Sequence, residues 1–239
     1  MVEKLQTQTH LPILQMQNVN KDISGYPLLR NINITVHSGE LVYIIGENGT
    51  GKTTLLNLMS HEDVPDTGLI QVGNYLLSDL TKEDIPYFKR TIGYMHQNAG
   101  LIPNATVKEN LIYPLNALGY DRKTVKQRYN DILTLTGLYD YRNKNVGSVA
   151  HPELSGGQLQ LVALGQAMVN KPDVLFCDEP TGNLYSGKAD YIMDVLEKIA
   201  KMNTAVVMVT HSPEYVKNRP HNTYEIVNKT LVQRRKVAY

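Results

Sequence analysis

The sequence predicts an α/β fold with a mainly parallel sheet, an N-terminal antiparallel β-subdomain and an α-helical insertion. Apolar residues alternate between residues 12 and 45, which is the spacing of paired antiparallel strands. Residues 106–138 instead carry apolar positions at helical spacing, with charged residues between them. After residue 154, helical stretches alternate with short apolar runs, as they do where helices cover a parallel sheet.

The composition is that of an ordinary globular protein. Of the 239 residues, 42% are hydrophobic and 20% are charged, and the net charge of +1 gives no basic excess that would indicate nucleic acid as a partner. Cys177 is the only cysteine, which excludes a disulfide framework within one chain. No apolar run reaches the roughly 18–20 residues that span a bilayer, and the start lacks the apolar core of a secretion signal. We therefore expect a cytoplasmic protein that reaches a membrane only through a partner.

The first elements follow in order along the chain. Ile32, Ile34 and Val36 alternate within one strand, and turn residues at 24–25 and 38–39 separate it from its neighbours. The continuous apolar run from Leu41 to Ile45 is expected of a strand buried on both faces. A glycine-rich turn then leads into a helix that we expect over residues 53–60.

The later elements are helices and buried strands. Two or three helices are expected between residues 106 and 138, ending at Gly137, with a polar loop over residues 142–148. The chain then continues with a helix over 155–170, a strand over 174–177, a helix over 187–201 and a strand over 205–209. We interpret the helical stretch, about residues 98–163, as an insertion into a single domain of residues 1–239.

A phosphate-binding motif lies between the buried strand and the following helix. The segment fits the P-loop pattern G-x-x-x-x-G-K-[ST], and with the next threonine the predicted ATP-binding residues are Gly46, Glu47, Asn48, Gly49, Thr50, Gly51, Lys52, Thr53 and Thr54. The glycines let consecutive N–H groups point into one hollow, to which the helix dipole adds. Lys52 would reach the β- and γ-phosphates, and the Thr53 hydroxyl would ligate Mg²⁺. A chance glycine-rich turn would not need this strand–helix context, so the motif predicts a P-loop NTPase core.

Two acidic residues close the apolar strand at residues 174–177. Carboxylates at the carboxyl end of a parallel strand lie where ligands bind in such sheets. Alone, Asp178 and Glu179 would more often open a solvated loop. Beside a P-loop, Asp178 is placed to hold Mg²⁺ through water, and Glu179 to orient or deprotonate the attacking water.

A serine and two glycines open the helix that follows the polar loop, in the segment Leu154-Ser155-Gly156-Gly157-Gln158. A helix N-terminus of this kind binds anions, although a plain capped helix would need only one glycine. Together with the P-loop and the two acids, this segment resembles the signature of the ATP-binding-cassette (ABC) ATPases. The resemblance extends from Ile13 to about Val232.

The resemblance implies further site residues and a dimer. Gln97 is similar to the lid glutamine that contacts Mg²⁺ and the attacking water, and His211 to the switch histidine that hydrogen-bonds the γ-phosphate. The residues that would contact ATP bound to the opposite subunit are Ser155, Gly156, Gly157 and Gln158. The implied Mg²⁺ ligands are Thr53, Gln97 and Asp178, and the implied catalytic residues are Glu179, His211 and Gln97. Two chains would thus sandwich two ATP molecules.

Within the family, residues 178–184 resemble the ATPases of the lipoprotein-releasing, macrolide-export and cell-division systems. Residues 85–90 favour the cell-division type and residues 110–115 the exporter type, so both branches stay open. All of them pair the ATPase with a membrane protein. The resemblance therefore implies an ATP-hydrolysing homodimer that drives a separate permease or transmission subunit, held peripherally on the inner face of the cell membrane.

Three features depart from the family's pattern. Tyr185 stands where the family usually has an aspartate in the loop after the catalytic glutamate. Ile23 occupies the position of the aromatic residue that stacks on adenine, with Tyr26 three residues on. Leu161 and Gln166 lie in the helix after the signature, which normally carries arginines. The phosphate-contacting residues all match, so these departures bear on the hydrolysis rate more than on ATP binding.

Two other functions stay open. Tyr185 supports a regulatory ATP-binding module, in which nucleotide toggles a complex and turnover is very low. A soluble, non-transport ABC ATPase that serves nucleic acid or cluster assembly is the third hypothesis. The near-neutral charge and the lack of a cysteine set count against it.

Overall fold

A computed structural model of the protein describes residues 12–97, 100–148, 152–182, 184 and 186–234. Four of its strands form an antiparallel sheet: β1 (Pro12–Ile23), β2 (Tyr26–His37), β4 (Thr67–Val72) and β5 (Tyr75–Leu76). Their order is β2-β1-β4-β5, and β1 and β2 form the predicted hairpin, in which Ile34 pairs with Met16 and Val36 with Leu14. Because the alternating apolar side chains of β2 are buried, the alternation correctly predicted the core-facing side of this strand.

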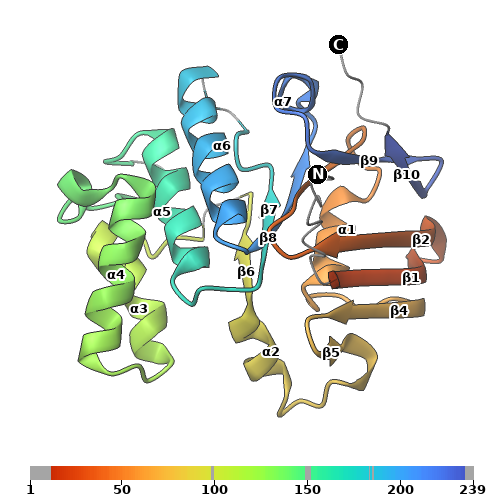
Figure 1. The fold of residues 1–239 in the computed structure, drawn as a ribbon, viewed down its shortest axis with the longest axis horizontal. Coiled ribbons are helices and arrows are strands. Elements are labelled where there is room, and N and C mark those ends of the chain that lie inside the picture. The colour runs from red at the N-terminus through yellow and green to blue at the C-terminus, as the bar shows by residue number, and fades with distance from the viewer. Residues whose placement is uncertain (1–11, 98–99, 149–151, 183, 185, 235–239) are drawn as a thin grey trace, which may run out of the picture.

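Six strands form the second sheet, in the order β10-β9-β3-β8-β7-β6. They are β3 (Leu41–Ile45), β6 (Ile92–Met95), β7 (Val174–Asp178), β8 (Ala205–Thr210), β9 (Asn222–Val227) and β10 (Thr230–Arg234). All pairs in this sheet are parallel except β9 with β10. The predicted fold class, an α/β core with a mainly parallel sheet beside an antiparallel one, is therefore confirmed (Figure 1).

Most helices occupy the stretches that the sequence predicted as helical, whereas the two short helices at residues 85–91 and 213–218 were not predicted. The helices are α1 (Lys52–Met59), α2 (Ile85–Thr91), α3 (Val107–Ala117), α4 (Arg122–Thr136), α5 (Gly156–Met168), α6 (Ser186–Lys201) and α7 (Pro213–Asn218), with short 3₁₀ turns η1 (Leu77–Asp79) and η2 (Tyr139–Tyr141). Asp121 caps the start of α4 by accepting hydrogen bonds from two backbone N–H groups, and Gly137 ends it in the left-handed conformation. The predicted stop at Gly137 is thus confirmed.

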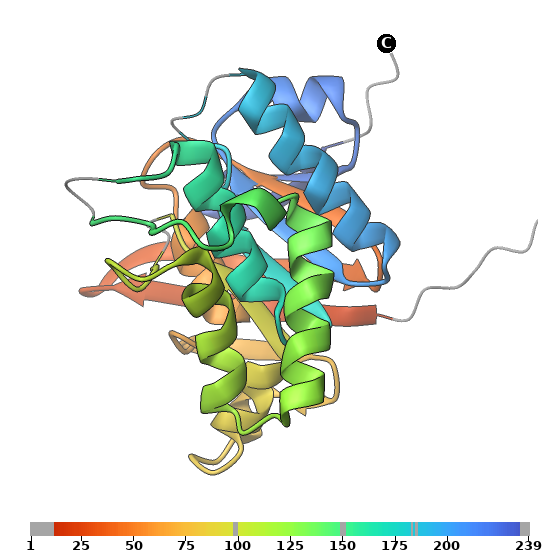
Figure 2. The ribbon, with the colours of Figure 1, turned by 90° about the vertical axis from the view of Figure 1, so that its left-hand side faces the viewer.

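The helices α3, α4 and α5 pack against one another beside the six-stranded sheet. Figure 2 shows this group from its outer side, with α3 and α4 in front of the sheet. The insertion of about residues 98–163 into a single domain stays a prediction. None of the helices that the structure describes is long and apolar enough to cross a membrane.

The six-stranded sheet separates two buried apolar clusters. Tyr43 and Met208 point into a cluster that contains the inner faces of α3–α6, whereas Ile44 and Val207 point into one shared with β1, β2 and α1. Since the central strands are covered on both faces, their sequences are continuously apolar. The carboxyl ends of β3, β7 and β8 are consequently held in fixed positions at one edge of the sheet, where the candidate site lies.

Candidate functional site

The P-loop connects β3 to α1 by a tight turn. Gly51 caps α1 with φ of 101°, a left-handed conformation that favours glycine. A Cβ at this position would lie 3.1 Å from the side chains of Leu28 and Leu29, so the β1–β2 hairpin closes directly over the loop. Lys52 is buried, and its ammonium donates hydrogen bonds to the carbonyl oxygens of Gly46 and Glu47, each at 2.9 Å. The carbonyl oxygens of the loop thus bind the Lys52 ammonium group.

Asp178 lies at the carboxyl end of β7, opposite the start of α1. Asp178 and Thr53 line the same pocket. Burial raises the pKa of the Asp178 carboxyl, while the nearby Thr53 side chain and the charge of Lys52 oppose this. Hydroxyl, carboxylate and amide oxygens from Thr53, Asp178 and Gln97 are the hard donors that Mg²⁺ prefers, so this set fits that cation.

Glu179 is held by backbone and side chain together. Its φ of 53° lies in the left-handed region, and its N–H donates to the Val209 carbonyl oxygen of the neighbouring strand at 3.1 Å. The carboxylate oxygen Oε1 lies 2.7 Å from Nδ1 of His211, which follows β8. The other oxygen, Oε2, is buried without a hydrogen-bond partner among the described residues. A strained backbone and an unpaired buried oxygen at one residue are typical of a functional carboxylate.

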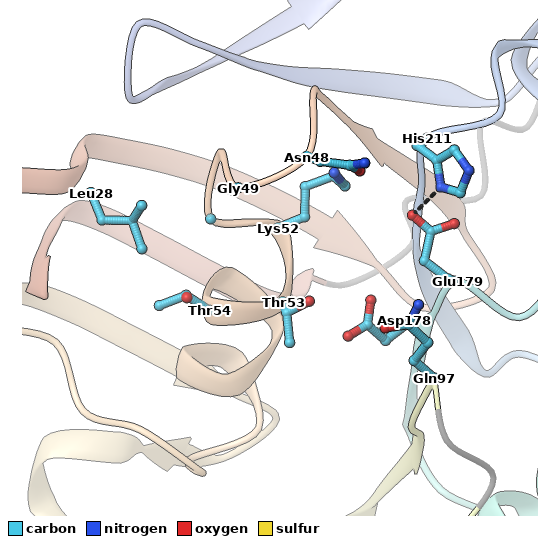
Figure 3. Close-up of a pocket in the computed structure, with 11 residues that line it drawn as sticks. Leu28, Asn48, Gly49, Lys52, Thr53, Thr54, Gln97, Asp178, Glu179 and His211 are labelled. Carbon is cyan, nitrogen blue, oxygen red and sulfur yellow. Dashed lines mark hydrogen bonds and ion pairs between the residues drawn. The ribbon is translucent and has the colours of Figure 1, made fainter. Parts of the chain in front are cut away.

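These groups line one pocket of about 350 Å³ (Figure 3). It is lined by Leu28, Asn48, Gly49, Gly51, Lys52, Thr53, Thr54, Gln97, Asp178, Glu179 and His211. The structure therefore brings the predicted lid glutamine, switch histidine and acidic pair together with the P-loop. Of the predicted ATP-binding residues of the P-loop, Gly46, Glu47 and Thr50 belong to the loop but do not line the pocket.

The signature segment lies elsewhere. Ser155 caps α5 in a capping box: its hydroxyl accepts from the Gln158 N–H, and the Gln158 side chain accepts from the Ser155 N–H at 2.9 Å. None of Ser155, Gly156, Gly157 and Gln158 lines the P-loop pocket of the same chain. Gly156 instead lines a separate hollow of about 590 Å³, which shares only Gln97 with the first.

The family model of ABC transporters matches residues 29–182, which include the P-loop, the signature and both acids. The chain belongs to the ABC transporter family. The cell division ATP-binding protein FtsE of Streptococcus pneumoniae (serotype 2, strain D39) is 35% identical over 224 residues, which cover 93% of this chain and 95% of FtsE. The lipoprotein-releasing system ATP-binding protein LolD of Aquifex aeolicus is 36% identical over 221 residues, covering 92% and 96%.

A solved structure extends the likeness to three dimensions. The ATP-binding cassette MJ0796, in a dimeric post-hydrolysis state bound to ADP and Pi, matches with a TM-score of 0.80 at 27% identity, covering 95% of this chain and all 100% of that one. This chain is therefore an ABC-type ATPase, in the group that contains FtsE and LolD, as the motifs predicted.

The ABC ATPase departs from its family where the adenine is expected. Ile23 and Tyr26 pair across the β1–β2 turn, both are exposed, and neither lines the pocket. Leu28, two residues further along β2, does line it, a contact that sequence reasoning missed. Alternation along β2 marked the residues of the sheet core, and nothing in the pattern distinguished Leu28 from them.

Two departures from the family's pattern remain. Tyr185 is outside the described residues, so its interpretation rests on the sequence. Leu161 is buried in the apolar cluster that α5 helps to form, where an arginine would be desolvated. Gln166 donates a hydrogen bond to the Asn110 carbonyl oxygen at 3.4 Å, and so ties α5 to α3 without a charge.

Proposed function

We propose that this ABC ATPase works as a homodimer that closes around two Mg-ATP molecules and transmits closure and opening to a separate membrane permease or transmission subunit. One observation carries the proposal. The pocket holds the P-loop, both acids, Gln97 and His211, whereas the signature helix α5 begins outside it. The N-terminus of α5 is a second anion-binding end that does not line the P-loop pocket of its own chain, so a second copy would complete each pocket.

Each residue of the pocket has a separate proposed role in phosphoryl transfer. Lys52 and the P-loop N–H groups would bind the β- and γ-phosphates, and Thr53, Asp178 and Gln97 would hold Mg²⁺, whose positive charge would offset the charge that develops on the phosphates. Glu179 orients the attacking water and accepts its proton through the unpaired Oε2, while His211 holds Oε1. Little covalent chemistry is required, because positioning and charge stabilisation supply most of the rate.

The relatives support the proposed kind of partner and process. FtsE is a cell division ATP-binding protein, and LolD is the ATP-binding protein of a lipoprotein-releasing system. We place this chain at the inner face of the membrane, where it would bind a permease or transmission subunit. The permease would dock in the hollow of about 590 Å³ that Gln97 and Gly156 both line. The regulatory-module alternative remains on the strength of Tyr185 alone.

Assembly is tested with Glu179→Gln, which should slow hydrolysis while ATP still binds. We expect light scattering to show a monomer without nucleotide and a dimer at saturating Mg-ATP. Adding Ser155→Arg to this variant should abolish the dimer while each monomer still binds Mg-ATP through its own P-loop, whereas the exposed control Ser78→Arg should leave the dimer intact. A Glu179→Gln protein that stays monomeric at saturating Mg-ATP, or dimers indifferent to Ser155→Arg, would contradict the sandwich.

A further inference from the structure

An arginine clamp joins α7 to α6. Arg219, the first residue after α7, places Nη1 at 2.7 Å from Oδ1 of Asp194 and 3.2 Å from Oε1 of Glu197, and Nη2 at 3.5 Å from Oδ1 of Asp190. Nη2 also donates to the Asp190 carbonyl oxygen at 3.4 Å. The three acids follow one another at helical spacing, so they form one face of α6. His221 adds a weaker contact to Glu197 at 3.4 Å.

The clamp holds the far end of a segment whose near end is His211. Only Ser212 separates His211 from α7, and Arg219 follows the last residue of that helix. A helix of six residues is too short to be stable alone, so its position depends on tertiary contacts. In this segment Val216 packs against the apolar cluster, and Arg219 makes ionic contacts with α6.

The same clamp lies at one end of a closed circuit through the candidate site. From Glu179 the chain runs to α6, the Arg219 clamp joins α6 to α7, and α7 runs back to His211. The contact of His211 with Glu179 closes the circuit at the other end. Figure 1 shows α7 and the beginning of α6 at the same end of the molecule, while the rest of α6 runs back alongside β7 and β8.

We propose that Arg219 is a positioning residue for ATP hydrolysis, which keeps His211 in contact with Glu179 by anchoring α7 to α6. The inference rests on the proposed role of His211. Three carboxylates over two turns span about 10 Å of helix, which suits a planar guanidinium with several donors better than an ammonium. Without Arg219 the three acids would repel one another and the end of α7 would lose these contacts with α6. His211 would then sample orientations away from Glu179.

The first experiment compares Arg219→Ala, Arg219→Lys and a control, Lys171→Ala, which breaks the exposed ion pair of Lys171 with Asp131 away from the pocket. We expect Arg219→Ala to lower kcat about three- to tenfold with KM for ATP within about twofold of the parent. Arg219→Lys should recover part of the loss, and Lys171→Ala should keep the parent kcat. A parent-like kcat in Arg219→Ala, in protein that melts cooperatively, would overturn the proposal.

The second experiment separates this inference from the proposed function. If Arg219 acts through His211, the double variant Arg219→Ala/His211→Ala should be no slower than His211→Ala alone, because the two losses are not additive. A parent-like rate in His211→Ala refutes the proposed role of the histidine itself. A low rate in His211→Ala that Arg219→Ala lowers further refutes only the clamp.

A spectroscopic measurement decides the case where His211→Ala has no measurable rate. The imidazole ¹⁵N signals of His211, assigned by their loss in His211→Ala, should move in Arg219→Ala and stay in place in Lys171→Ala. Unmoved signals in Arg219→Ala would show that the clamp does not position His211, and would overturn the proposal.

Discussion

The Nδ1 atom of His211 lies 2.7 Å from Oε1 of Glu179, while Oε2 of the same carboxylate is buried without a hydrogen-bond partner among the described residues. One oxygen is thus anchored and the other remains available to accept a hydrogen bond. Leaving an acceptor unpaired in a buried position costs about 1–3 kcal/mol. The protein retains this cost at a carboxylate that lines the P-loop pocket and contacts a histidine, an arrangement that suits the proposed general base.

Replacing Glu179 with glutamine should separate binding from chemistry. The amide keeps the shape of the side chain but accepts no proton, so we expect phosphate release to fall by about 10²–10⁴-fold. ATP affinity should stay close to that of the parent, because Lys52 and the P-loop are untouched. Phosphate release and equilibrium nucleotide binding would be measured on the same preparation, with the exposed Glu83→Gln as the matched control. Brisk hydrolysis by Glu179→Gln would rule out the assigned base.

A ring at residue 23 should tighten ATP binding. Ile23 is 46% exposed beside the pocket's hairpin and offers adenine no aromatic face, so we expect weak affinity and poor discrimination against GTP. Base–aromatic stacking contributes about 1–3 kcal/mol in nucleic-acid complexes, which makes a gain of tenfold or more reasonable for Ile23→Tyr. Titration with ATP and GTP would measure it.

The control for this prediction is Tyr26→Ala. If Tyr26, which is 77% exposed at the hairpin turn, already supplies the ring, this variant loses affinity and Ile23→Tyr gains little. If neither variant changes affinity, the base binds away from the β1–β2 turn.

Tyr185 decides between a motor and a regulatory module. In the family an aspartate at this position reaches toward the opposite P-loop, and a tyrosine hydroxyl carries neither its charge nor its shape. We expect slow basal turnover in the parent and faster turnover in Tyr185→Asp, with ATP affinity unchanged. Steady-state hydrolysis without any partner is the measurement. Fast hydrolysis by the parent, unaltered in Tyr185→Asp, would remove the support for the regulatory reading.

Gly68→Ala should destabilise the antiparallel sheet. At φ of 94°, a Cβ on Gly68 would lie 2.5 Å from Cα of Val19 and 2.6 Å from the carbonyl oxygen of Asn18, and backbone atoms of a paired strand have little freedom to move. We expect a loss of about 2–4 kcal/mol in the free energy of unfolding, measured by denaturant titration. Gly119→Ala is the matched control, because its φ of 75° carries similar strain with no atom within 4 Å. Equal losses in both variants would mean that strain alone, and not the close approach of β1, is responsible.

The spacing of apolar residues, together with the residues that end helices and strands, predicted most of the fold. The run Leu41–Ile45, the strand before Asp178 and the stop at Gly137 each follow from a local signal, namely double burial, an apolar run and a left-handed cap. The order of strands in the sheet does not follow from such signals. Which strands become neighbours is decided by long-range packing, so the position of β8 between β3 and β7 had to come from the structure.

The candidate site was predictable where a motif fixes the chemistry. Lys52, Asp178 and Glu179 lie in segments whose residue types and context specify phosphate and metal chemistry. Leu28 and Arg219 were not predictable, because the function of each depends on a partner far away in the chain: Gly51 for Leu28, and the acidic face of α6 for Arg219. A leucine in a strand and an arginine after a short helix carry no local signal of either relationship.

The placement of β8 between two apolar clusters limits how its sequence can drift. All six residues of Ala205–Thr210 are buried, and both faces of the strand are committed to different sets of neighbours. A change in side-chain size at one position requires the helices on one face to move. A change at the next position requires the β1–β2 hairpin on the other face to move. A library that randomises each residue from Ala205 to Val209 in turn should recover almost no polar residues, whereas exposed positions of α6 should accept them.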